Sequence, residues 1–143
     1  MTKLLLTAAI APLLFTIACA TSSHGAAPEG AHVETVQTQR LVLRGVSEGT
    51  TGSASCKAPA AGKSTSYVEL KEDTNGNFAL RPMAGVAVLH VTHLGTQKTW
   101  CMTTQSDGSG AIIPGEFATG VYAVDVQSAG SSSQPYAVQF ERL

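Results

Sequence analysis

Short runs in which apolar and polar residues alternate recur along most of the chain. In the segment 67–71, Val68 and Leu70 fall on one side of an extended chain and charged residues on the other, which is the period of a half-buried β-strand. No window of about a dozen residues shows the spacing of an amphipathic helix together with its capping residues. The pattern therefore predicts a domain built almost entirely of β-strands.

Turn residues between these segments set the expected strand pairing. The pair Asn75-Gly76 favours a tight turn, so segments 67–71 and 78–80 are expected to form a hairpin. The C-terminal segment 136–140 alternates cleanly and is expected to pair with 121–126 across the intervening Gly- and Ser-rich loop. Further strands are expected over 36–46, 85–95 and 111–113.

Two stretches of the chain are alike. Residues 85–95 and 120–130 have the same length and begin and end with glycine. In both, apolar residues share one face of a strand while His90 or Asp125 takes the other, so both polar residues are expected to be exposed. A chain of 143 residues has room for one core. We expect a small antiparallel β-sandwich, Ig-like or jelly-roll-like, over residues 35–143.

The N-terminus carries a different pattern. Lys3 precedes an uncharged, apolar stretch over residues 4–20, which is the arrangement of a secretory signal. The run is shorter than the roughly 20 apolar residues that span a bilayer, and Pro12 interrupts it. We therefore predict a signal peptide over 1–18. The small, polar residues of 19–34 show no period and predict a flexible tether.

The end of the apolar stretch, Ala18-Cys19-Ala20, fits two kinds of processing. It is similar to a bacterial lipoprotein signal, in which a small residue precedes a Cys that is lipidated, although Thr16 stands where that signal usually has Leu. This resemblance implies a membrane anchor on Cys19 in the cell envelope, with about 0.8 kcal/mol of binding per buried methylene. Ordinary signal peptidase would instead cut before Thr21 and leave a periplasmic or secreted protein.

The other two cysteines, Cys56 and Cys101, suit an exported protein. An even pair in an oxidising compartment is expected to form one disulfide. Composition limits the partners further, because only 13% of residues are charged and the formal net charge is -1. A nucleic-acid binder needs a basic face, so no nucleic-acid partner is expected, and no motif predicts a cofactor.

The C-terminal third resembles two families of exported β-sandwich modules. Its Gly-x-Tyr strand, polar loop and closing strand resemble the final hairpin of bacterial pre-peptidase C-terminal domains; the matching residues are Gly120, Tyr122, Val124, Val126 and Tyr136. Carboxypeptidase regulatory-like domains share a similar pattern, here Asp107-Gly108, Ile112 and residues 120–122. Both families are non-catalytic, so the resemblance implies a binding or stabilising role beside other proteins.

Catalytic and metal-binding patterns are weak in this sequence. It has no Gly-x-Ser-x-Gly elbow and no His-Glu-x-x-His helix. His90 and His93 are three residues apart, which on a strand directs their rings to opposite faces, so no zinc site is expected. Asp73, Asn75 and Asn77 supply oxygen atoms at alternate positions but lack the Gly and the acidic residue of an EF-hand loop. We predict neither catalytic residues nor metal ligands.

Trp100 and Tyr67 are the candidate ligand-binding residues. Core packing is the favoured interpretation of Trp100, whereas both rings on one exposed face would indicate a carbohydrate-binding module. The sequence predicts an exported, lipid-anchored, non-catalytic β-sandwich with a binding or accessory role toward an envelope protein or polysaccharide. The alternatives are a secreted carbohydrate-binding module and a small secreted hydrolase, which would need His90 or His93 beside a carboxylate or a Cys.

Overall fold

A computed structural model describes residues 25–50, 54–57, 65–105, 107 and 109–143. The predicted signal peptide 1–18 and the candidate lipidation site Cys19 lie outside these residues. Every regular element in the described part of the chain is a β-strand. Over the same residues no helix has the length and apolar character needed to cross a membrane.

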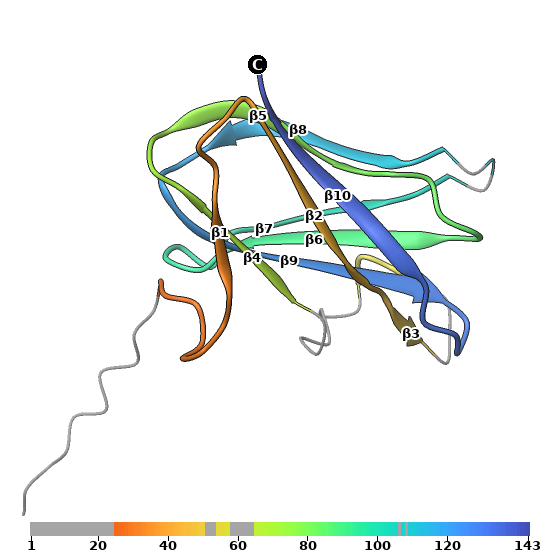
Figure 1. Ribbon diagram of the computed structural model, residues 1–143. Coiled ribbons are helices and arrows are strands. Elements are labelled where there is room, and N and C mark those ends of the chain that lie inside the picture. The colour runs from red at the N-terminus through yellow and green to blue at the C-terminus, as the bar shows by residue number, and fades with distance from the viewer. Residues whose placement is uncertain (1–24, 51–53, 58–64, 106, 108) are drawn as a thin grey trace, which may run out of the picture.

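The strands form two sheets that pack against each other (Figure 1). Sheet A has the order β1-β4-β9-β6-β7, with β3 also paired to β9. Its strands are β1 (Val33–Thr35), β3 (Glu48–Thr50), β4 (Ser66–Leu70), β6 (Ala87–His93), β7 (Thr99–Thr103) and β9 (Gly120–Ala129). Sheet B has the order β2-β10-β5-β8, and its strands are β2 (Arg40–Val46), β5 (Thr74–Leu80), β8 (Ala111–Phe117) and β10 (Pro135–Arg142). The predicted β-sandwich is confirmed.

Alternate residues of both sheets meet in the core between them. Successive side chains of a strand point to opposite faces, so each strand with an apolar period of two contributes one buried row. Phe78 of sheet B is at the centre, with its ring 5.0 Å from that of Phe117 and 4.8 Å from that of Phe140. The Tyr122 hydroxyl of sheet A enters the same cluster and donates a hydrogen bond of 2.6 Å to the Ala118 carbonyl. These aromatic rings supply much of the buried apolar area.

Two glycines permit close contacts that a side chain would block. Gly45 lies opposite Tyr136 in the β2–β10 register, and a Cβ at this position would lie 2.6 Å from the phenol ring. Gly120 begins β9 with a φ of 139°, which disfavours other residues, and a Cβ there would meet the His93 ring. Both glycines let a buried ring lie directly against the backbone.

Two of the predicted strand pairings are wrong. The segments expected to form a hairpin at Asn75-Gly76 lie in different sheets, and this dipeptide is inside β5 rather than in a turn. Gly76 is required there because a Cβ would lie 2.6 Å from the Glu141 carbonyl oxygen of β10. Strand β10 pairs with β2 and β5 and not with β9. In both cases the connecting loop crosses from one sheet to the other.

The first strand begins inside the segment predicted as a tether. Strand β1 starts at Val33 and runs parallel to β4. The next residue after it, Val36, is buried, and its amide donates a hydrogen bond of 3.0 Å to the Glu69 carbonyl. Residues from Val33 onward therefore belong to the folded domain.

Candidate functional site on the outer face of sheet A

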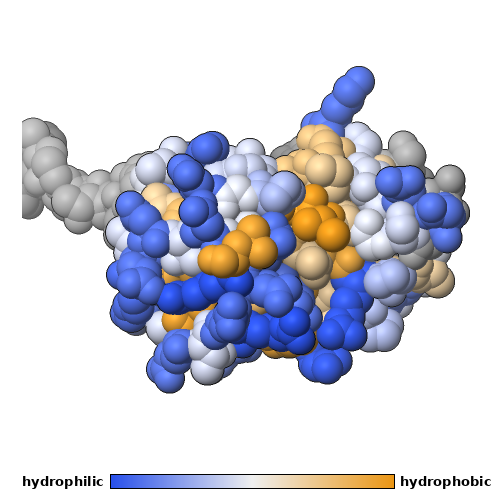
Figure 2. Space-filling model, turned by 90° about the horizontal axis from the view of Figure 1, so that it is seen from above, coloured by the Kyte–Doolittle hydropathy of each residue, from blue (hydrophilic) through white to orange (hydrophobic). Residues whose placement is uncertain are grey.

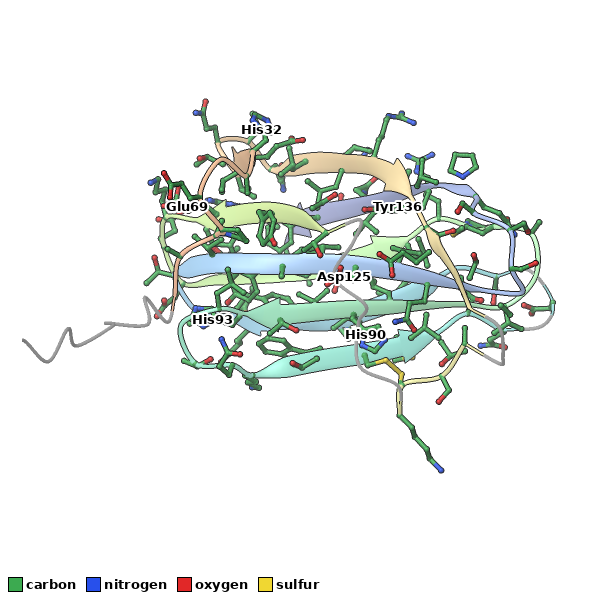
Figure 3. All side chains as sticks on the ribbon, turned by 90° about the horizontal axis from the view of Figure 1, so that it is seen from below. His32, Glu69, His90, His93, Asp125 and Tyr136 are labelled. Atoms are coloured by element: carbon green, nitrogen blue, oxygen red, sulfur yellow. A yellow bond between two sulfur atoms is a disulfide. The ribbon has the colours of Figure 1, made fainter. Side chains whose placement is uncertain are left out.

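Four side chains form a line across the face of sheet A that points away from the core. We call this line the polar row: Thr65, Asp125, His90 and Cys101. His90 on β6 is directly opposite Asp125 on β9 and Cys101 on β7 in the strand register. Thr65 precedes β4, and its hydroxyl donates a hydrogen bond to the Asp125 carboxylate. Figure 3 shows His90 and Asp125 near the middle of this face.

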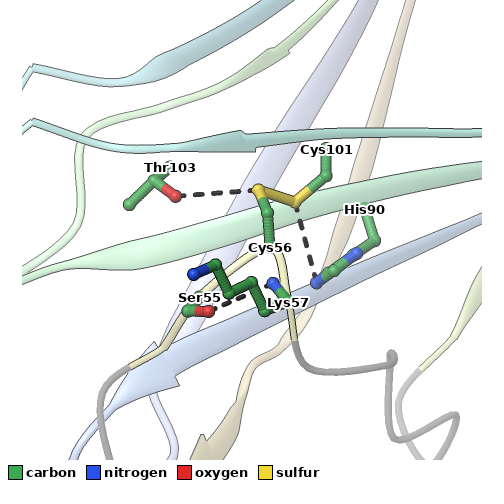
Figure 4. Close-up of a disulfide and its surroundings, with 6 residues drawn as sticks. All are labelled: Ser55, Cys56, Lys57, His90, Cys101 and Thr103. Carbon is green, nitrogen blue, oxygen red and sulfur yellow. Dashed lines mark hydrogen bonds between the residues drawn. A yellow bond between two sulfur atoms is a disulfide. The ribbon is translucent and has the colours of Figure 1, made fainter.

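The predicted exposure of His90 and Asp125 is wrong. His90 is only 4% exposed, and Asp125 is partly buried. A short segment from a distant part of the sequence, residues 54–57, lies beside His90 on the outer face (Figure 4). Its Ala54 is buried at 7% exposure, and Cys56 bonds it to β7. We call residues 54–57 the covering segment.

The predicted disulfide between Cys56 and Cys101 is present, with 5.7 Å between the two Cα atoms. Its two sulfur atoms have different neighbours (Figure 4). The Cys101 sulfur lies 3.9 Å from Nε2 of His90, whereas the Cys56 sulfur lies 3.8 Å from the Thr103 hydroxyl. Cys56 is exposed and Cys101 is half-buried. One cysteine is therefore in an exposed segment, and the sulfur of the other adjoins a titratable ring.

Burial shifts both titratable groups of the polar row toward their neutral forms. It lowers the pKa of the His90 imidazole below its usual value, and the nearby Asp125 carboxylate opposes this shift. Burial also raises the pKa of the Asp125 carboxyl. The hydrogen bond from Thr65 and the charge of His90 act against that rise, while the carboxylate of Glu48 adds to it. Each group is thus more easily ionised when the other carries its charge.

His93 lies on the opposite face of β6 from His90, as the spacing predicts. Its ring packs edge-on against Tyr122 in the core, with 4.8 Å between ring centroids. The Thr96 amide donates to Nδ1 at 3.0 Å, and Nε2 is 3.1 Å from the Thr119 carbonyl oxygen, which can only accept. Both ring nitrogens of His93 are therefore used in holding the β6–β7 turn and the start of β9.

Trp100 and Tyr67 do not form a common platform. Trp100 is opposite Val91 on β6 and faces the core, with its ring 5.3 Å from that of Phe117. Tyr67 is opposite Ala123 on β9 and points to the other face of the same sheet. Trp100 thus packs against the core, as favoured from the sequence, and the shared exposed face that the carbohydrate-binding alternative would need is absent for these two rings, because the alternation of the sheet separates them.

Tyr67 instead lines a groove between β1, β2 and β4 of about 240 Å³, which we call the side groove. His32, Glu34 and Arg44 also line it, so that an aromatic ring, an imidazole, a carboxylate and a guanidinium share one small site. Thr65 lines it too and connects it to Asp125 of the polar row. Sequence reasoning missed the three charged or titratable residues because they come from two different strands and a loop, with no common motif.

A second hollow, of about 390 Å³, lies where β5 meets β8 and includes Asp73, Asn75 and Glu116. Asp73 accepts a hydrogen bond of 2.8 Å from the Thr119 amide, which uses one carboxylate oxygen in holding the loop. Across the residues that the structure describes, no group of three or more His, Cys, Asp or Glu side chains is placed to hold a metal ion.

Comparison with known proteins does not place this chain in a family. No protein-family model matches the sequence, and no curated protein matches it. A β-glucosidase from Paenibacillus barengoltzii is similar in structure, with a TM-score of 0.45 and 15% sequence identity over 82% of this chain. This chain spans 12% of the length of that enzyme. At this level of similarity the comparison carries no argument about function.

Proposed function

We propose that this protein is an exported, lipid-anchored β-sandwich of the bacterial cell envelope that acts by binding. The observation that carries this proposal is the Cys56–Cys101 disulfide, because such bonds form and persist in oxidising compartments and are rare in the cytosol. The secretory pattern that precedes Cys19 agrees with it. Acyl chains on Cys19 would hold the domain at a membrane surface.

The side groove supports the binding part of the proposal. Ligand sites are concave and combine apolar or aromatic surface with a few polar groups that fix orientation. Tyr67 provides a ring, while His32, Glu34 and Arg44 provide donors and acceptors around it. This mixture favours a polysaccharide of the envelope over an apolar ligand. A secreted carbohydrate-binding module is therefore the second candidate, with Tyr67 in the site and Trp100 outside it.

The polar row bears on the hydrolase alternative. It does place His90 beside a carboxylate and a cysteine, as that alternative requires. Nucleophilic catalysis by cysteine needs a thiolate, however, and the Cys101 sulfur is bonded to Cys56. We therefore propose that the oxidised protein acts without catalysis.

The anchor can be tested by intact mass measurement on membrane and soluble fractions of the native host, with and without Cys19→Ala. The proposal predicts a mass increase from acylation in the membrane fraction that the substitution abolishes. A mature chain that begins at Thr21 in the soluble fraction would contradict the anchor and leave a diffusible protein.

The side groove can be tested by retention on purified envelope polysaccharide. Tyr67→Ala and Arg44→Ala are each expected to weaken retention roughly tenfold, the loss of a central contact residue. Ile112→Ala is the matched control, because this exposed side chain lies on β8, which contributes no residue to the side groove. Equal retention of all four proteins would exclude the groove as the binding site.

A further inference from the structure

We propose that the Cys56–Cys101 disulfide is a site of thiol–disulfide exchange, in which an external thiolate attacks the Cys56 sulfur and Cys101 leaves as a thiolate stabilised by His90. The partner is a dithiol, either a small molecule or an extracytoplasmic dithiol protein. This inference goes beyond a binding role and does not depend on the lipid anchor.

The exposure of the two sulfur-bearing residues sets the direction of attack. Cys56 is exposed in the covering segment, whereas Cys101 is half-buried on β7. An attacking thiolate needs access to the sulfur with which it bonds. Of the two residues Cys56 is the more exposed, and attack on its sulfur leaves the Cys101 sulfur as a thiolate on β7, beside His90.

The leaving sulfur has a neighbour suited to its developing charge. The Cys101 sulfur is 3.9 Å from Nε2 of His90, and an imidazolium at this place would lower the pKa of the Cys101 thiol. A leaving thiol of lower pKa departs faster. The Cys56 sulfur adjoins the neutral Thr103 hydroxyl instead. The two halves of the disulfide therefore differ chemically as well as in exposure.

The electrons and bonds of the exchange balance with a dithiol as the reductant. In the first step the attacking thiolate forms a bond to the Cys56 sulfur while the Cys56–Cys101 bond breaks and its electron pair stays on Cys101. In the second step the other thiol of the reductant gives up its proton and displaces Cys56, and the Cys56 sulfur takes up a proton as it leaves. The dithiol is oxidised to a disulfide, both cysteines are reduced, and the Cys101 thiolate pairs with protonated His90.

Charged groups around His90 come from three other elements. Asp125 faces it from β9 and favours the imidazolium, and Glu48 on β3 acts in turn on Asp125. Lys57 is the exposed cation of the covering segment. Burial lowers the pKa of His90, so the protonated fraction of this ring grows only as the pH falls below its usual value of 6.5.

The first test is the rate of reduction by dithiothreitol across pH, expressed per reductant thiolate. For the wild type this rate is expected to rise about three- to tenfold as the pH falls and His90 takes up its proton. His90→Gln should abolish that rise. Thr103→Val, which alters the other sulfur's neighbour, should retain it. A rise that persists in His90→Gln would overturn the role of His90.

The second test needs no variant. Brief treatment with glutathione, acid quenching and peptide mapping by mass spectrometry identify the cysteine that carries the first adduct. The proposal requires glutathione on Cys56 and a free thiol on Cys101. An adduct mainly on Cys101 would overturn the direction of attack, and a disulfide that resists reduction until the protein unfolds would overturn exchange altogether.

Discussion

The outer faces of the two sheets differ although similar alternating strands build them. On sheet A the central residues Val88 and His90 are buried at 0% and 4% exposure. On sheet B the outer face is open, and Ile112 on β8 is 55% exposed. Figure 2, which views sheet B from outside, shows hydrophobic residues lying among hydrophilic ones. The same period of two therefore gives a second buried layer on one sheet and a solvent face on the other.

The two outer faces also differ in a covalently attached segment. Only sheet A has such a segment bonded to its outer face, through Cys56 and Cys101, among the residues that the structure describes. On sheet B the outer side chains make solvent-exposed contacts such as the ion pair of 2.9 Å between Arg40 and Glu141. Exposed pairs of this kind contribute little to stability. The outer face of sheet A thus carries a covalently linked segment, whereas outer side chains of sheet B form exposed contacts.

Among the changes that test this difference between the two outer faces, removal of the disulfide should lower the free energy of unfolding the most. The double variant Cys56→Ser/Cys101→Ser opens a loop with a sequence separation of 45, and the chain-entropy model gives a loss of about 4 kcal/mol. The free energy of unfolding, measured by urea denaturation, checks this value. A change below about 1 kcal/mol would mean that the covering segment stays in place without the bond.

A matched pair of truncations should give a smaller effect and compare the two faces directly. Val88→Ala removes buried methyl groups from sheet A and is expected to cost about 1–3 kcal/mol in unfolding free energy. Ile112→Ala on the open face should change it by about 0.5 kcal/mol or less. Equal losses of unfolding free energy in the two variants would show that truncating an outer side chain costs the same on both sheets.

The smallest effect concerns pH. Because the pKa of His90 is lowered in the folded state, its contribution to stability is complete above the usual value of 6.5. That contribution is lost as the pH falls from 6.5 through the lowered pKa. His90→Gln has no such titration, so the stability of the wild type relative to this variant should decline over that window. Urea denaturation at several pH values measures this difference in unfolding free energy. The variant His32→Gln, at an exposed histidine, is the control. If the difference in unfolding free energy between the wild type and His90→Gln does not change with pH, burial does not lower the pKa of His90.

The sequence was informative where the signal is local. Alternation in segments such as 67–71 predicted the β-sandwich, and the pairing of two cysteines followed from compartment chemistry. The errors are all nonlocal. Asn75-Gly76 has the composition of a turn, but the packing of Gly76 against β10 places it inside a strand. Whether a loop crosses to the other sheet depends on the whole core.

The candidate site was less predictable than the fold for the same reason. His90 occupies the outer face of its strand, as alternation predicts, but it is buried and lies beside residues 54–57, which are far away in sequence. The side groove likewise combines residues near positions 32, 44 and 67. Neither arrangement leaves a local pattern that spacing arguments can detect.

Strand β10 lies inside sheet B, between β2 and β5, although it is the last strand of the chain (Figure 1). Strand β10 pairs with β2 over positions such as Glu141 and Arg40. Sheet B therefore cannot be continuous until residues 135–142 are present. In a chain that emerges N-terminus first, β2 and β5 therefore remain unconnected until β10 has emerged. Their apolar faces remain uncovered for the same time. Contacts over such sequence distances slow folding and lengthen exposure to aggregation. Vectorial synthesis would thus postpone closure of the sandwich until β10 has emerged.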